Sequence, residues 1–149
     1  MIISYHGVQS FKIQFGDIVI AYNPISKDSS FKGVRYGADI ALSSLNHPDF
    51  NGFDMIGRGE KMPFVISGAG EYEIKEVFIK GFGSASEYGG KPQINTIYTV
   101  ALEGINLCFL GAQSSPELSN ETIEGLDGVD VLFVPVGGDG VLDPAHAYK

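Results

Sequence analysis

The sequence predicts a β-rich domain of the mixed α+β or α/β class. Twenty glycines and seven prolines among 149 residues indicate many turns and short connections. Several segments alternate apolar and polar residues with the period of two that is typical of half-buried strands. Near residue 115 this period changes and helix-capping patterns begin, so helices are expected late in the chain.

The first 25 residues predict a β-meander. Ser10–Phe15 alternates apolar and polar residues, Gly16 and Asp17 supply a turn, and Asp17–Tyr22 returns as a more deeply buried strand. Asn23 and Pro24 end that strand. Residues 26–37 are rich in Ser, Lys, Asp and Gly and predict an exposed loop.

The middle of the chain predicts further strands separated by polar loops. The expected strands cover residues 38–42, 63–66, 71–74 and 76–81, and residues 84–93 predict a polar loop. Residues 95–102 and 105–110 are expected to pair as a hairpin across Glu103 and Gly104.

The last third of the chain mixes helical and strand signals. Ser115 resembles a helix cap, with Pro116 at the first helical position and a modest apolar face from Leu118 to Leu126. The apolar run 129–136 predicts a strand covered on both faces, and Gly137–Gly140 predicts a turn rather than a phosphate-binding loop. Asp143 then caps a helix of fewer than two turns.

Composition excludes several classes of function. The net charge is −8 and the ten basic residues are scattered, which argues against nucleic-acid binding. No apolar run approaches the roughly 20 residues needed to span a membrane, and the N-terminus lacks the features of a signal peptide. We therefore expect a cytoplasmic protein. The single cysteine, Cys108, lies in an apolar strand and is interpreted as a buried hydrophobe, not a catalytic thiol.

The loop Ser43–Asn51 follows an apolar strand and resembles a metal loop of the pattern His-x-His-x-Asp-His that has lost half of its ligands. Together with segments around residues 1–24, 70–75, 95–98, 110–111, 130–138 and 143–145, it resembles a small bacterial branch of the metallo-β-lactamase-fold hydrolases. The resemblance implies an αββα sandwich of two mixed β-sheets. It also implies one domain over residues 1–149, C-terminally incomplete because the family's final helix and strand are lacking.

In that family two zinc or other divalent ions hold a bridging hydroxide, and each ion needs about three protein ligands. The resemblance places Leu45, Phe50, Ser86 and Ala112 at four ligand positions, so that only His47 and Asp49 remain. These two belong to different metals, and one ligand does not make a tight site. Two outer positions, Val8 and Asn23, also depart from the family pattern. We therefore expect no bound cofactor and interpret His47 and Asp49 as vestigial.

Simpler roles compete with metal binding for each remaining residue. His47 is either a ligand or a loop histidine bonded to a neighbour, and Asp49 is either a ligand or the cap of a following helix. His6 is interpreted as structural and His146 as exposed.

Two hypotheses of function follow. The chain is either a catalytically silent relative with a binding or assembly role, or a metal-dependent hydrolase with a weak or rearranged site and an unknown small-molecule substrate. Whether it is an enzyme stays open at this point. Without the final helix and strand, apolar surface around Val131–Val136 is expected to be exposed, which predicts a homo-oligomer.

Overall fold

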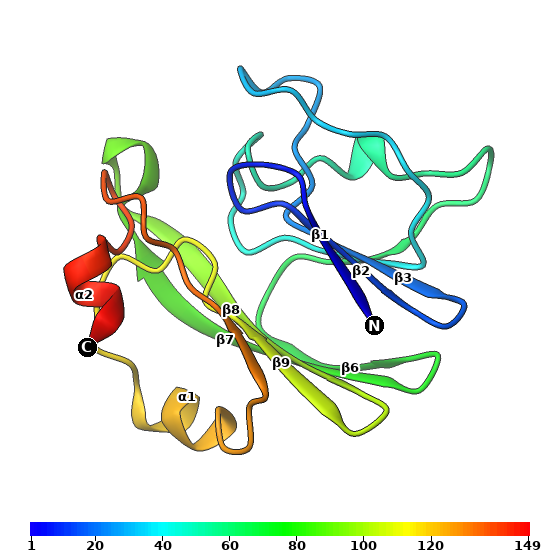
Figure 1. The fold of residues 1–149 in the computed structure, drawn as a ribbon. Helices are drawn as coiled ribbons and strands as arrows, with labels where there is room; N and C mark the ends of the chain where they lie inside the picture. The colour runs from blue at the N-terminus through cyan, green and yellow to red at the C-terminus, as the bar shows by residue number, and fades with distance from the viewer. The chain divides into compact units, whose positions relative to one another are not determined.

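The computed structural model describes residues 1–149 as two compact units, Met1–Ser67 and Gly68–Lys149. Each unit is built around one five-stranded sheet (Figure 1). None of the helices has the length and apolar character that a membrane span requires.

The first unit contains the predicted meander extended by two parallel strands. Strands β1, β2 and β3 pair antiparallel, and β3, β4 and β5 pair parallel, in the order β1-β2-β3-β4-β5. The sheet is therefore mixed, and a short 3₁₀ helix, η1, follows β4. The bounds are β1 Ile2–Tyr5, β2 Phe11–Phe15, β3 Ile18–Tyr22, β4 Ile40–Leu42, η1 Phe53–Met55 and β5 Phe64–Ile66.

The core of this unit follows from the strand patterns. All three residues of β4 are buried, as expected for a strand with neighbours on both sides. In β2 the alternation leaves Ile13 buried while Gln14 is exposed. One face of the sheet carries a cluster of Ala21, Ala41, Met55 and Ile56.

The second unit forms the second mixed sheet. Strands β6 to β9 pair antiparallel in sequence order, and β10 pairs parallel with β9. The bounds are β6 Gly70–Ile74, β7 Val77–Ser86, η2 Tyr88–Gly90, β8 Gln93–Leu102, β9 Ile105–Phe109, α1 Asn120–Gly125, β10 Val131–Phe133 and α2 Pro144–Tyr148. A core cluster of Ile97, Cys108 and Leu110 packs with side chains that flank α1 and β10, including Leu126 and Val134.

The predicted hairpin of β8 and β9 is confirmed. The adjacent strand pair of β7 and β8 is longer than expected. Leu102 pairs with Ile105, and the two turn residues, Glu103 and Gly104, have φ angles of 45° and 80°. Such a two-residue turn matches the twist of the strands. The polar loop predicted over 84–93 is wrong at both ends, because residues 84–86 pair with residues 93–95 and extend β7 and β8. Polar side chains do not prevent this backbone pairing.

The first α-helix begins later than predicted. Ser119, not Ser115, is its N-cap: the Ser119 side chain accepts a hydrogen bond from the Thr122 N–H at 3.2 Å. Ser115 instead accepts from the Glu117 N–H, also at 3.2 Å, which forms a local turn. Serine suits both arrangements, so the residue type alone does not locate the cap. The Asp143 cap of α2 is confirmed.

The strand predicted over residues 129–136 is reduced to the three residues of β10. Pro135 has no N–H and cannot extend the ladder with β9. The strand is not covered on both faces, because Leu132 is 50% exposed. Val136 is 55% exposed, so the expected exposure of apolar surface in this region is confirmed.

Val8 adopts a backbone conformation that its side chain disfavours. Its φ of 51° lies in the left-handed region, where a β-branched residue is strained and asparagine is tolerated. Val8→Asn is expected to raise the free energy of unfolding by about 1 kcal/mol, measured by urea denaturation. Val8→Ala keeps the strain and serves as the control. A loss of stability in Val8→Asn would contradict the assignment of strain.

Candidate functional site: a closed loop after β4

The loop Ser43–Asn51 leaves the C-terminal end of β4 and turns back tightly on itself. The His47 N–H donates to the Leu45 carbonyl at 2.9 Å, and the His47 carbonyl accepts from the N–H groups of Phe50 and Asn51 at 2.8 and 3.0 Å. The neighbouring segment holds the loop in place: the Ser26 N–H donates to the Pro48 carbonyl at 2.8 Å. These backbone bonds fix where the side chains of Leu45, His47, Asp49 and Phe50 lie.

His47 and Asp49 interact with each other. The Asp49 N–H donates to His47 Nδ1 at 3.0 Å, and the Asp49 carboxylate lies 3.5 Å from the same nitrogen. Accepting that bond requires the lone pair of Nδ1, which places the proton of the neutral ring on Nε2. The ring edge also contacts Phe50, with centroids 6.2 Å apart. This geometry matches the interpretation of His47 as a loop histidine bonded to a neighbour.

Asp49 does not cap a helix, so that prediction is wrong. The next helix, η1, has Gly52 as its N-cap and no side-chain capping bond. Asp49 is 6% exposed and instead accepts a hydrogen bond from the Ser29 hydroxyl at 2.5 Å. The same Ser29 hydroxyl accepts from the Phe31 N–H at 3.0 Å. Asp49 thereby anchors the loop of residues 26–37 to the loop after β4.

Two apolar side chains stand at positions to which the resemblance assigns metal ligands. Leu45 is 2% exposed and Phe50 is fully buried. Both positions point into the protein interior, where a metal ligand without its metal would be a costly buried polar group. The interior at this loop is therefore packed with hydrocarbon.

Asn23, which the sequence marked only as a drifted outer position, has a structural role. It is fully buried with a φ of 47°, a conformation that asparagine tolerates. Its Oδ1 accepts from the Ser44 N–H at 2.8 Å, and its Nδ2 donates to the Ser44 hydroxyl at 3.0 Å. Asn23 thus ties the end of β3 to the start of the loop.

The two positions of the second unit to which the resemblance assigns ligands lie at one end of its sheet. Ser86 ends β7 and is 1% exposed, and its hydroxyl accepts from the Tyr88 N–H at 3.1 Å. Ala112 follows β9 and is fully buried, and its N–H donates to Asn95 Oδ1 at 2.9 Å. Asn95 near the start of β8 thus organises this end, a role that sequence reasoning missed because its partners are distant in the chain.

The donor set does not fit the two-metal centre that the fold family implies. No group of three or more His, Cys, Asp or Glu side chains is gathered anywhere in residues 1–149. Cys108 is fully buried, and burial raises the pKa of its thiol to about 12, so it stays protonated. His146 lies on α2, where its Nδ1 is 2.8 Å from the Asp143 carboxylate.

His6 is the third histidine, and its environment predicts a pH dependence of stability. Burial, with a contribution from Lys12, lowers the pKa of His6 below its usual value of 6.5. The folded chain therefore binds fewer protons at His6 than the unfolded chain, and its contribution to stability is lost as the pH falls below about 6.5. The free energy of unfolding is expected to fall between about pH 7 and pH 5.

His6→Gln removes the titrating group and is expected to flatten this part of the curve, measured by urea unfolding at several pH values. A His6→Gln curve with the native slope would contradict the assignment.

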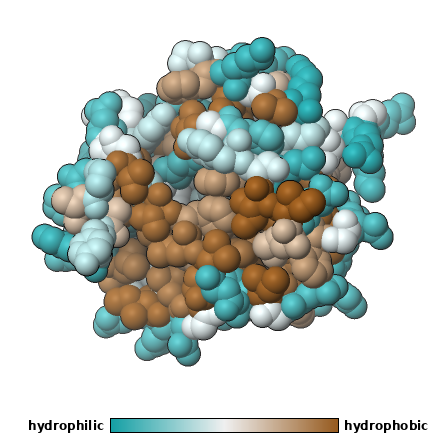
Figure 2. All heavy atoms as spheres, in the orientation of Figure 1, coloured by the Kyte–Doolittle hydropathy of each residue, from teal (hydrophilic) through white to brown (hydrophobic).

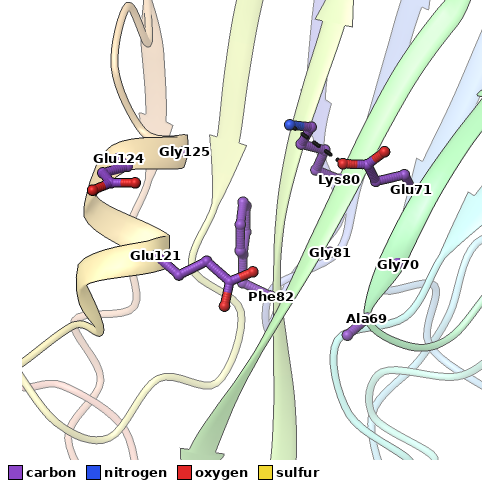
Figure 3. A pocket seen from close by; sticks show the side chains of 9 residues that line it. All are labelled: Ala69, Gly70, Glu71, Lys80, Gly81, Phe82, Glu121, Glu124 and Gly125. Atoms are coloured by element: carbon purple, nitrogen blue, oxygen red, sulfur yellow. Dashed lines mark ion pairs between the residues drawn. The ribbon is translucent and has the colours of Figure 1, made fainter.

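At least one hollow in each unit could receive a ligand. One of about 440 Å³ lies at the C-terminal ends of β4 and β5 and offers hydroxyls, amides and one ring but no metal ligand; it is lined by Ser43, Asn46, Asn51, Phe53 and Ser67. The other lies in the second unit between α1 and the strands β6 and β7 (Figure 3). Glutamates are prominent among the residues around it.

Comparisons with known proteins agree with this fold. A protein from Thermotoga maritima, described as a zinc-dependent hydrolase of the metallo-β-lactamase superfamily, is 26% identical, with a TM-score of 0.77 over 98% of this chain. This chain spans 66% of the length of that protein. A structure from Parabacteroides distasonis, described as a metal-dependent hydrolase, is 14% identical with a TM-score of 0.72, and the match covers 97% of this chain and 74% of that one.

A diiron β-hydroxylase from Streptomyces venezuelae shares the fold at 13% identity and a TM-score of 0.62. The match covers 89% of this chain and 34% of the hydroxylase chain. Among curated proteins, none matches. The predicted fold class is confirmed by the two mixed sheets and by these structures. The family model of the β-lactamase superfamily domain matches residues 2–149, and the chain therefore belongs to that superfamily.

Proposed function

We propose that this chain is a catalytically silent member of the β-lactamase superfamily with a binding or assembly role. One observation carries the proposal: at the loop after β4, two ligand positions hold the buried side chains Leu45 and Phe50. The two remaining polar residues, His47 and Asp49, are hydrogen-bonded to each other, and Asp49 also accepts a hydrogen bond from the Ser29 hydroxyl. A hydrolytic two-metal site needs about three ligands for each ion and an open position for water.

The test is the metal content of the purified full chain after exposure to zinc and then to manganese. We expect far less than one ion per chain, and no change in His47→Ala/Asp49→Asn, which serves as the matched control. Near-stoichiometric metal in the native chain that is lost in the control variant would overturn the proposal.

The alternative is a metal-dependent hydrolase with a rearranged site that acts on an unknown small molecule. It is favoured by the 26% identity to the Thermotoga maritima protein described as a zinc-dependent hydrolase. Zinc-stimulated hydrolysis of chromogenic esters or phosphodiesters that disappears in His47→Ala would support it. Location in the cytoplasm, and the assignment of residues 1–149 to one domain, stay predictions.

We also propose self-association through apolar surface near β10. Figure 2 shows apolar side chains gathered over the region of α1 and β10. Ile123, Leu132 and Val136 are each at least half exposed, and β10 is an edge strand. Light scattering is expected to give a mass near twice that of one chain, falling towards the monomer in Leu132→Glu. A monomer at high concentration would contradict this.

A further inference from the structure

A groove crosses the face of the second sheet on which α1 lies. It consists of two adjoining hollows of about 580 and 280 Å³, which share Glu71, Lys80 and Gly125 in their linings. The first hollow lies between α1 and the β6–β7 pair (Figure 3). The second continues over β7 and β8 to Phe78 and Ala101. The groove is therefore elongated and open, a shape that suits an extended chain.

The floor of the groove is aromatic. Phe78, Lys80 and Phe82 alternate along β7 and so lie on one face of the sheet. Phe82 is half-buried and Phe78 is 54% exposed. A side chain at Gly125 would place its Cβ 2.4 Å from the Phe82 ring, so α1 approaches this ring closely only because residue 125 is glycine.

Acidic side chains outnumber basic ones around the groove. Lys80 is paired with Glu71, with 3.5 Å between Nζ and Oε1. From the opposite wall, Glu121 reaches from α1 towards Phe82 (Figure 3), and Glu124 lies one turn further along the helix. No lysine or arginine in the chain forms an ion pair with either of these two glutamates. A negative charge is left facing an aromatic ring.

The charge of the whole unit reinforces this local excess. Residues 68–149 contain 12 acidic and four basic side chains, whereas residues 1–67 contain six of each. The entire net charge of −8 thus belongs to the second unit. A unit with this negative net charge attracts cationic partners and repels nucleic acid and other acidic surfaces.

We propose that this groove binds a basic, partly apolar segment of a partner protein in extended form. An arginine or lysine of that segment lies over Phe82 beside Glu121, where ring and carboxylate both attract the cation. An apolar side chain of the same segment packs on Phe78. Length, openness and the exposed apolar floor favour a peptide over a small polyamine, which would need only the carboxylates.

The groove gives the proposed binding role a location, but it does not depend on the loop after β4. All of its residues belong to the second unit, whereas Leu45, His47, Asp49 and Phe50 belong to the first. Metal measurements test the loop, and peptide binding tests the groove. Each proposal can therefore fail without the other.

The probe is a fluorescent octapeptide of alternating arginine and leucine, titrated with the full chain and followed by fluorescence anisotropy. Saturable binding is expected, and Glu121→Gln/Glu124→Gln is expected to weaken it roughly five- to tenfold. The matched control, Glu87→Gln/Glu117→Gln, removes the same charge from exposed positions outside the groove and should change the affinity less than twofold. Phe78→Ser is expected to weaken binding about threefold by removing apolar contact.

Three results would overturn the proposal. They are the absence of saturable binding, equal losses in the groove and control variants, and equal affinity for a peptide with glutamine in place of arginine. If spermine displaces the peptide at the peptide's own concentration, a small polycation is the ligand and the peptide assignment is wrong. Circular dichroism of each variant confirms that the fold is retained, since all the substituted side chains are exposed.

Discussion

Replacing Phe50 with histidine is expected to lower the free energy of unfolding by about 3–4 kcal/mol. Phe50 is fully buried, so the substitution removes hydrocarbon from a packed interior and leaves part of its volume empty. The imidazole also brings two polar nitrogens into a site that hydrocarbon occupies, and unsatisfied buried polar atoms are costly. Introducing the histidine that the family resemblance places at this position is thus expected to damage the fold.

Urea unfolding of Phe50→His against the native chain measures this loss. Phe31→His is the matched control: it makes the same chemical change in the same unit at a side chain that is 51% exposed, and is expected to shift stability by no more than about 0.5 kcal/mol. Equal stability of Phe50→His and the native chain, or a melting temperature that rises with added zinc, would show that a polar cavity survives there.

Local patterns predicted most of the strands, because period-two alternation reports one buried face directly. The hairpin could be predicted because two apolar strands flank Glu103 and Gly104, and glycine tolerates the positive φ angle that a two-residue turn requires. The start of α1 could not, since Ser115 and Ser119 are both plausible caps. The structure settles on Ser119, whose helix places Thr122 in the interior at 2% exposure.

The sequence could predict which residue types stand in the candidate loop but not which contacts they make. The resemblance assigned ligand positions to Leu45 and Phe50, and both side chains proved to be buried. The partner of Asp49 could not be read from the sequence, because Ser29 lies 20 residues away and no local rule pairs them. From the local sequence, Asp49 was expected to cap a helix that begins within the next few residues, and that expectation was wrong.

In the groove of the second unit, too, one part could be predicted from the sequence and another could not. Alternation along β7 places Phe78, Lys80 and Phe82 on one face, which the sequence alone could have revealed. Glu121 faces this strand from α1, about 40 residues later, and that contact depends on tertiary packing. Sequence reasoning therefore registered the net charge without locating it.

The second large expected effect is at Asn95, whose substitution by alanine should cost about 3–4 kcal/mol. Asn95 is fully buried, and its amide makes three hydrogen bonds of 2.9 Å. Its Nδ2 donates to the Ser84 hydroxyl and the Leu110 carbonyl, and its Oδ1 accepts from the Ala112 N–H. Alanine would leave those buried backbone groups without these partners.

Asn106→Ala is the control, because Asn106 lies on the adjacent strand β9 and its side chain makes one exposed bond, to the Gly128 carbonyl at 3.1 Å. Its loss is expected to cost at most about 1 kcal/mol, measured by urea unfolding. Asn95→Asp keeps the acceptor for Ala112 but turns a carboxylate oxygen towards the Leu110 carbonyl, so it should be nearly as destabilising as alanine. If Asn95→Ala and Asn106→Ala lowered the free energy of unfolding equally, the Asn95 amide would not be what holds the segment after β9 in place. The expected large loss instead means that hydrogen bonds of the Asn95 side chain hold this end of the second sheet together.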